Sequence, residues 1–76
     1  MAKLPVVSGM DVIKVFVRAG WLLARQRGSH VSLKKAGVKV LLTVPLHREV
    51  DPGVLRRLIR DAGMTVEEFV AVLGRL

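Results

Sequence analysis

The sequence predicts an α+β fold in which a three-stranded antiparallel sheet carries its helices on one face. Apolar residues recur at helical spacing near the N-terminus and over the last third of the chain. Between them lie alternating and β-branched segments separated by short glycine-containing turns, which is typical of an antiparallel meander. At 76 residues, the chain has material for one domain, residues 1–76, built from two layers.

The first helix is expected to begin after Ser8, which has the side chain of an N-cap. Asp11 follows at a position where a carboxylate complements the helix dipole. Ile13, Phe16 and Val17 are interpreted as one buried stripe. Gly20 is expected to end the helix, because glycine readily takes the left-handed conformation that follows a helix.

Three strands and two turns are expected in the middle of the chain. The strands are 21–26, 30–34 and 38–44, and the turns are 27–29 and 35–37. Gly28 and Gly37 suit the positive φ that such turns need. Pro45 is expected to end the third strand. Both faces of the first strand are mixed in polarity, and we assign Arg25 to the face away from the helices.

Two helices are expected after the strands. Asp51 and Pro52 form a start signal, an N-cap followed by proline at the first helical position, and Gly63 is the expected stop. Thr65 and Glu68 have the spacing of a capping box for the last helix. The expected apolar stripes are Leu55, Leu58 and Ile59 in the first helix and Phe69, Val70 and Leu73 in the second.

Strand alternation predicts which side chains share a face of the sheet. Val31 and Leu33 alternate with His30, Ser32 and Lys34, and Val38, Val40, Leu42 and Val44 alternate with Lys39, Leu41 and Thr43. Pairing across the turn at Gly37 places Leu33 near Val40, so the two apolar sets share the core face. His30 then lies on the open face near Thr43, with the lysines of both strands further along.

The charge distribution predicts a polyanionic partner. Thirteen Lys and Arg against six Asp and Glu give a net charge of +7, and no acid occurs between Val12 and Arg48. Eight bases lie in that stretch, which favours nucleic acid over the alternative of a merely solvated surface. The chain has no cysteine and no apolar run long enough for a signal peptide or a membrane span. We therefore expect a cytoplasmic protein that does not contact membranes.

His30 is the candidate for proton transfer, because an imidazole gains and loses a proton near neutral pH. RNA carries its own nucleophile, the 2′-hydroxyl, so a general base, a general acid and nearby cations suffice to cleave it without a metal ion. A lone histidine is weak evidence, and a polar residue at a strand start with no special role is the alternative interpretation.

Other candidate sites receive less support. His47 is expected to lie more than about 10 Å from His30 unless the chain folds back after Pro45, and is interpreted as a surface or loop-ordering residue. Two histidines without cysteine make a poor zinc set, and no serine triad or phosphate-binding glycine signature is present. Arg56, Arg57 and Arg60 are interpreted as a solvated face or a contact for an acidic partner.

Four runs of the sequence resemble the HicA (YcfA-like) toxin family. They are SGMDVIKVFVRAGW, RQRGSHV, LTVPLH and DPGVLRRLIRDAGMTVEEF, which follow one another between residues 8 and 69, and the resemblance as a whole covers about residues 7–73. The resemblance implies a double-stranded-RNA-binding-domain-like fold, α-β-β-β-α, cleavage of messenger RNA, and neutralisation by a HicB antitoxin. The family's essential histidine, in its Gly-Ser-His segment, corresponds to His30. One departure is Val31, where many members have a polar or aromatic residue.

The leading hypothesis is therefore a metal-independent endoribonuclease toxin, an mRNA interferase, that needs no cofactor and uses His30 as its catalytic residue. The residues expected to bind RNA are Arg25, Arg27, Gly28, Ser29, Lys34 and Lys39. The expected partners are messenger RNA and a HicB-like antitoxin that covers the His30 face. Two alternatives remain: a non-catalytic RNA-binding module of the same fold, and a module that only docks an acidic protein.

Overall fold

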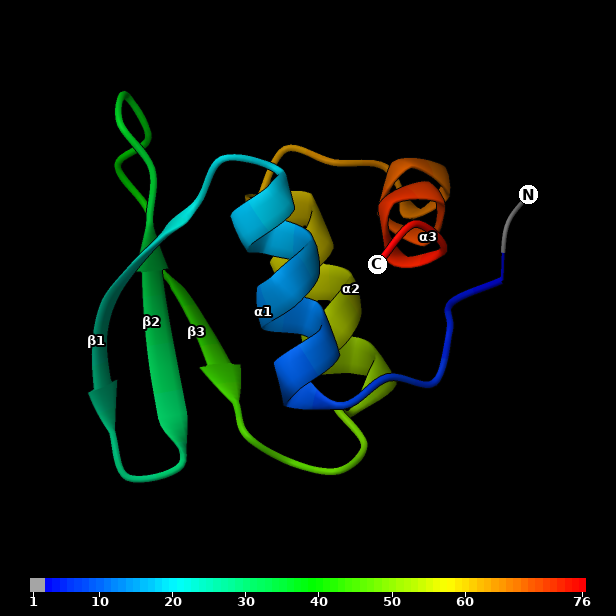
Figure 1. The fold of residues 1–76 in the computed structure, drawn as a ribbon, viewed down its shortest axis with the longest axis horizontal. Helices are drawn as coiled ribbons and strands as arrows, with labels where there is room; N and C mark the ends of the chain where they lie inside the picture. The colour runs from blue at the N-terminus through cyan, green and yellow to red at the C-terminus, as the bar shows by residue number, and fades with distance from the viewer. Residues whose placement is uncertain (1–2) are drawn as a thin grey trace.

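A computed structural model describes residues 3–76 as three helices on one side of a small sheet (Figure 1). The elements in chain order are α1 (Gly9–Arg18), β1 (Leu22–Arg27), β2 (His30–Lys34), β3 (Leu42–Pro45), α2 (Pro52–Asp61) and α3 (Val66–Leu73). The α-β-β-β-α-α order and the α+β fold confirm the prediction. Within the described residues, no helix combines the length and apolar character that a membrane crossing requires.

The helix ends form as the sequence predicts. The Ser8 hydroxyl accepts a hydrogen bond from the Asp11 N–H at 3.2 Å, and Asp51 accepts from the first turn of α2. At the start of α3, the Thr65 hydroxyl accepts from the Glu68 N–H at 3.0 Å and the Glu68 carboxylate accepts from the Thr65 N–H at 2.8 Å. Each cap satisfies N–H groups that have no partner inside the helix, which explains why the predicted helix starts are confirmed.

The strands form an antiparallel meander in the order β1-β2-β3. Gly28, with φ +58°, makes the turn between β1 and β2. β1 is displaced by one residue from the prediction: it begins at Leu22, after the buried Trp21, and it includes Arg27, which was assigned to the turn. β2 occupies the predicted residues, with Val31 and Leu33 buried and His30 and Lys34 exposed.

The prediction for the third strand was wrong in its bounds and its register. β3 covers only Leu42–Pro45, and Leu33 pairs with Leu42 rather than with Val40. The turn at Gly37 forms as expected, with φ +80°, but the chain then leaves the sheet. Figure 1 shows the resulting loop projecting beyond the end of the sheet.

Of the four apolar residues that were predicted to lie on the core face of the third strand, two are buried. Val38 and Val40 were assigned to the core but are 39% and 46% exposed, whereas Leu42 and Val44 are fully buried. The register moves by two residues, and an even shift leaves each side chain on its predicted face. For this reason the core face and the open face remain as predicted despite the wrong pairing.

The core lies between β2, β3 and the three helices. α1 and α2 contact β3, while α3 packs against the other two helices and lies farthest from the sheet (Figure 1). The Phe16 and Phe69 rings meet edge to face with centroids 5.7 Å apart, which joins α1 to α3. Val17 was assigned to the buried stripe but is 46% exposed, because α1 turns Val12, Ile13, Val15 and Phe16 inward instead.

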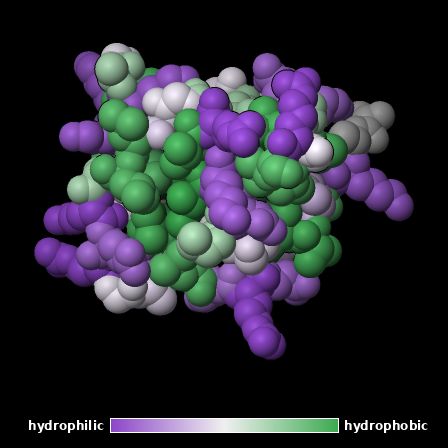
Figure 2. All heavy atoms as spheres, in the orientation of Figure 1, coloured by the Kyte–Doolittle hydropathy of each residue, from purple (hydrophilic) through white to green (hydrophobic). Residues whose placement is uncertain are grey.

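β1 lies outside this core, and all of its side chains are exposed. Leu22 and Leu23 are more than three-fifths exposed, because the helices contact β3 at the opposite edge of the sheet. Figure 2 shows apolar side chains gathered over β1 and α1 in this view. The helices therefore cover one side of the sheet as predicted, but their cover stops before the first strand.

Candidate functional site

The open face of the sheet carries His30 at the first position of β2. Its neighbours across the sheet are Arg27, which pairs with His30, and Arg25, which pairs with Ser32. Side chains directly opposite each other in an antiparallel pair share a face, so both arginines lie on the His30 face. The assignment of Arg25 to the open face is confirmed. An exposed imidazole and two exposed guanidinium groups thus occupy one end of the sheet.

A β-bulge explains why the sequence left the faces of β1 undecided. The pairing shifts between Leu23 and Arg25, so Ala24 has no partner on β2. The bulge interrupts the alternation, and Leu22 consequently shares the face of Arg25 although the two lie an odd number of residues apart. Assigning alternate residues of β1 to opposite faces of the sheet therefore groups residues from both faces together.

The turn before His30 leaves its backbone open to an approaching molecule. Apart from the residues next to it in the chain, no residue has an atom within 4 Å of the position that a Cβ on Gly28 would occupy. The Ser29 side chain is exposed, while its carbonyl oxygen accepts a hydrogen bond from the Leu46 N–H at 2.7 Å. Both turn residues predicted to bind RNA therefore lie next to His30 and are accessible.

The predicted lysines lie away from His30. Lys34 is exposed at the opposite end of β2, about 13 Å from His30 at the usual rise of a strand. Lys39 was expected on a strand, but it lies in the loop between β2 and β3, which follows from the shortened third strand. Lys35, half-buried beside Lys34, donates a hydrogen bond to the Ala19 carbonyl at 3.0 Å and so holds the end of α1.

A hollow of about 360 Å³ lies where the open face meets α2. Its lining residues are His30, Thr43, Pro45, His47, Val54 and Arg57. Alternate residues of an extended chain point the same way, which explains the contributions of Thr43, Pro45 and His47. Val54 and Arg57 are three apart on α2 and share one side of that helix.

The expectation that His47 lies remote from His30 was wrong. It relied on pairing His30 with residues 41–43, whereas His30 pairs with Pro45. The Leu46 N–H bond to Ser29 extends this ladder by one more step, so His30 and His47 are diagonal neighbours. Such neighbours have Cα atoms about 7–8 Å apart. The His47 carbonyl also accepts a hydrogen bond from the Gly9 N–H at 2.9 Å, which fixes this loop to the start of α1.

His47 and Arg57 are the residues that sequence reasoning missed. Pro45 was recognised as the end of the third strand, and pairing that end with the start of β2 at His30 would have given the correct register. Arg57 was grouped with Arg56 and Arg60, which were interpreted as a solvated face or a contact for an acidic partner. Arg57 comes three residues after Val54, so the sequence does indicate that the two side chains share one side of α2. It does not indicate that this side of α2 lies beside the end of β3, and Arg57 was missed for that reason.

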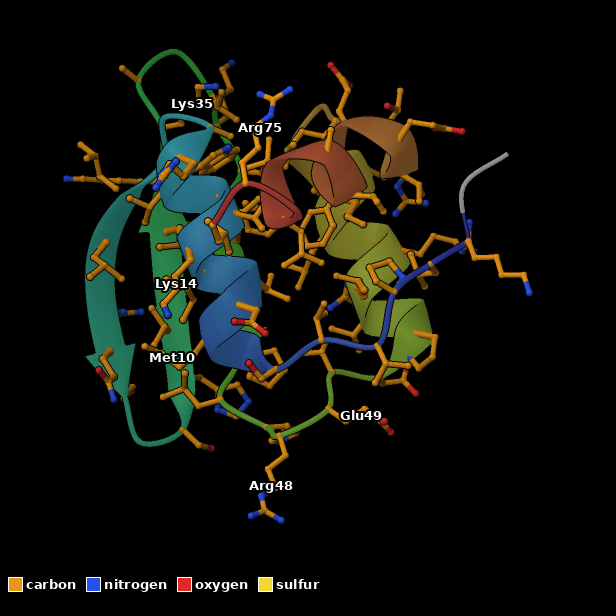
Figure 3. All side chains as sticks on the ribbon, turned by 45° about the vertical axis from the view of Figure 1, so that its right-hand side comes forward. Met10, Lys14, Lys35, Arg48, Glu49 and Arg75 are labelled. Atoms are coloured by element: carbon orange, nitrogen blue, oxygen red, sulfur yellow. The ribbon has the colours of Figure 1, made fainter. Side chains whose placement is uncertain are left out.

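The hollow is basic and contains no carboxylate. It is lined by two exposed imidazoles and one exposed guanidinium, and within residues 3–76 neither imidazole makes a hydrogen bond or an ion pair. Figure 3 shows Arg48 and Glu49, which follow His47, pointing away from the body of the molecule. An anion entering the hollow would thus meet positive charge and free nitrogen atoms.

Among residues 3–76, we find no group of three or more histidine, cysteine, aspartate or glutamate side chains that could hold a metal ion.

A comparison with protein families matches residues 9–64 to the family described as the HicA toxin of bacterial toxin–antitoxin systems. That segment begins with α1, includes the whole sheet and α2, and ends just before α3. No curated protein matches the chain.

Proposed function

The chain belongs to the HicA toxin family, the toxins of bacterial toxin–antitoxin systems, and from this premise we propose that it is a metal-independent endoribonuclease that cleaves messenger RNA. The observation that carries the proposal is His30, exposed on the open face with Arg25 and Arg27 beside it. This is the arrangement of a proton-transfer group among phosphate-binding cations.

The RNA supplies the nucleophile in this mechanism. His30 either removes the proton of a 2′-hydroxyl or protonates the departing 5′-oxygen, both of which an imidazole does near neutral pH. Arg25 and Arg27 bind the phosphates on either side of the cleaved bond through charge-assisted hydrogen bonds. The open space beside Gly28 and the exposed side chain of Ser29 let the RNA approach closely.

Lys34 and Lys39 contribute at a distance from the cleaved bond. Both are exposed, and both lie toward the end of the sheet remote from His30. We assign them to phosphates further along the bound strand, where they raise affinity without sequence preference. The proposed substrate implies action in the cytoplasm.

The proposed protein partner is a HicB-like antitoxin that covers the His30 face. Covering that face would exclude RNA from the basic surface and silence the toxin. A partner with acidic side chains would complement the arginines there, and charge complementarity of this kind speeds association and favours the correct partner.

The test compares wild-type protein with His30→Ala on labelled messenger RNA in excess EDTA, after circular dichroism shows that both are folded. Cleavage by wild type alone is expected. Equal cleavage by both proteins would exclude His30 as the catalytic residue.

The same experiment separates the alternatives. Salt-dependent binding of RNA that stays intact would instead indicate the RNA-binding module. If the wild type neither binds nor cuts RNA at moderate salt, the basic face serves only to dock an acidic protein.

A further inference from the structure

We propose that His47 is the second proton-transfer residue of the cleavage reaction, and that Arg57 binds the phosphate held between the two histidines. This inference rests on the proposed endoribonuclease function and deepens it. Cleavage through a 2′-hydroxyl needs one group to take a proton and another to give one, and His30 alone supplies a single group. The hollow that contains His30 contains one other titratable group of suitable chemistry, and that group is His47.

The geometry of the hollow brings three functional groups together from separate elements. His30 comes from the start of β2, His47 from the segment after β3, and Arg57 from α2. Thr43 and Pro45 form the wall contributed by β3, and Val54 forms the apolar wall contributed by α2. A hollow of about 360 Å³ is of the size that small-molecule sites have, so it can hold one phosphodiester and its neighbouring sugars.

The position of His47 is held by its backbone, which leaves its side chain free. The Leu46 N–H donates to Ser29 at 2.7 Å on one side, and the His47 carbonyl accepts from Gly9 at 2.9 Å on the other. The imidazole is exposed and makes no hydrogen bond within residues 3–76. Because two flanking hydrogen bonds fix the backbone of His47 while its exposed imidazole makes no hydrogen bond in the described part of the chain, the imidazole is available to a substrate.

The charges around the two imidazoles favour an anionic substrate. Arg27 on β1 lies opposite His30, and Arg57 faces the hollow from α2. On the α1 side, the Gly9 N–H meets the His47 carbonyl, and Asp11 lies in the first turn of that helix. Arg48 and Glu49 point away from the body of the molecule (Figure 3). The hollow itself has no carboxylate, so the guanidinium of Arg57 has no anionic partner there other than a bound phosphate.

The reaction balances with these groups alone. One histidine starts neutral and takes the proton of the 2′-hydroxyl, whose oxygen forms a bond to phosphorus. The bond between phosphorus and the 5′-oxygen breaks, and the other histidine, which starts protonated, gives its proton to that oxygen. The products are a 2′,3′-cyclic phosphate and a 5′-hydroxyl. Arg57 stabilises the negative charge that builds on the phosphate oxygens, and proton exchange with water resets the pair.

The test measures kcat and KM on a short RNA for His47→Ala, with Arg48→Ala as the matched control. Arg48 is the next residue, is exposed and points away from the body, so its loss removes a nearby charge without touching the hollow. His47→Ala is expected to lower kcat about 10²–10⁴-fold, the usual contribution of one acid–base group, with little change in KM. Arg48→Ala is expected to stay within a few-fold of wild type.

Two further measurements sharpen the assignment. In the double variant His30→Ala with His47→Ala, the loss should be close to that of the worse single variant, because residues that act as a unit are not additive. On an RNA with sulfur in place of the bridging 5′-oxygen, the leaving group needs no proton. One of the two single variants should then recover cleavage and the other should not.

Arg57→Ala has its own matched control in Arg56→Ala, which removes the same charge from the neighbouring position of α2 outside the hollow. Arg57→Ala is expected to lower kcat about 10²-fold or more, as loss of one group that stabilises transition-state charge does, and Arg56→Ala only slightly.

The outcomes separate this inference from the proposed function. If His30→Ala is inactive while folded His47→Ala cleaves like wild type, the inference fails and the proposed function stands. If the wild type does not cleave RNA, both fail. Products that lack a 2′,3′-cyclic phosphate at every time point would also overturn the inference.

Discussion

The two ends of the sheet differ in how the chain is held. At the end that carries His30, β3 pairs up to Pro45, and hydrogen bonds continue beyond it from Leu46 to Ser29 and from Gly9 to His47. At the other end, the pairing stops at Leu33 and Leu42, and the chain between β2 and β3 forms an exposed loop. Lys35 ties the start of this loop to α1 through the Ala19 carbonyl.

The catalytic candidates therefore lie at the end of the sheet where hydrogen bonds join the chain to distant segments. The histidine end is tied both to the turn between β1 and β2 and to the start of α1. The loop at the other end buries neither Val38 nor Val40. Groups that must meet a substrate in a defined geometry benefit from a rigid support, whereas a loop without buried side chains is free to vary.

The largest expected loss of stability tests whether β3 begins at Leu42 or extends back to Val40. Leu42→Ala should lower the free energy of unfolding by about 2–5 kcal/mol, because Leu42 is fully buried and its loss leaves a cavity. Val40→Ala, two residues earlier and 46% exposed, should change it by about 0.5 kcal/mol or less. Urea unfolding of both variants measures the contrast. Equal losses would mean that Val40 is part of the core and that the pairing is the one expected from the turn at Gly37.

The next effect tests the anchor of the histidine end. A Cβ at Gly9 would overlap the Pro45 carbonyl oxygen, which is backbone and cannot turn aside. Gly9→Ala should therefore cost about 1–3 kcal/mol of stability and also slow RNA cleavage by displacing His47. Gly74→Ala is the control, because its Cβ would make ordinary contacts at 3.5 Å. Unfolding and cleavage rates of Gly9→Ala that match the wild type would show that α1 does not hold the site.

The smallest expected loss of stability comes from replacing the glycines of the two turns, Gly28 and Gly37. Gly28 and Gly37 have φ of +58° and +80°, and a Cβ at either would meet nothing within 4 Å. Each alanine variant should therefore lose about 1–2 kcal/mol of stability, the strain of an L residue in the left-handed region. Cleavage, measured well below the unfolding midpoint, should fall for Gly28→Ala alone. A similar fall for Gly37→Ala would indicate that both ends of the sheet contribute to the RNA site.

Local signals in the sequence sufficed for most elements. Ser8, Asp51 and the pair Thr65 and Glu68 predicted the three helix starts, because capping depends on side chains within a few residues. Alternation in β2 predicted that His30 is exposed and Val31 buried, because that pattern needs only a covered face. Arg27 and Arg25 could be placed near His30 from the short turn at Gly28.

Short-range spacing was therefore enough to predict the element order and the open face that carries His30, whereas the choice of His30 as the catalytic candidate also needed the resemblance to the HicA family. The tertiary structure alone decided the register of β3, the bulge in β1 and the meeting of His47 and Arg57 with His30. Those features depend on contacts between segments far apart in the chain. Contacts of this kind, such as the packing of α1 and α2 against β3, leave no trace in a local sequence pattern.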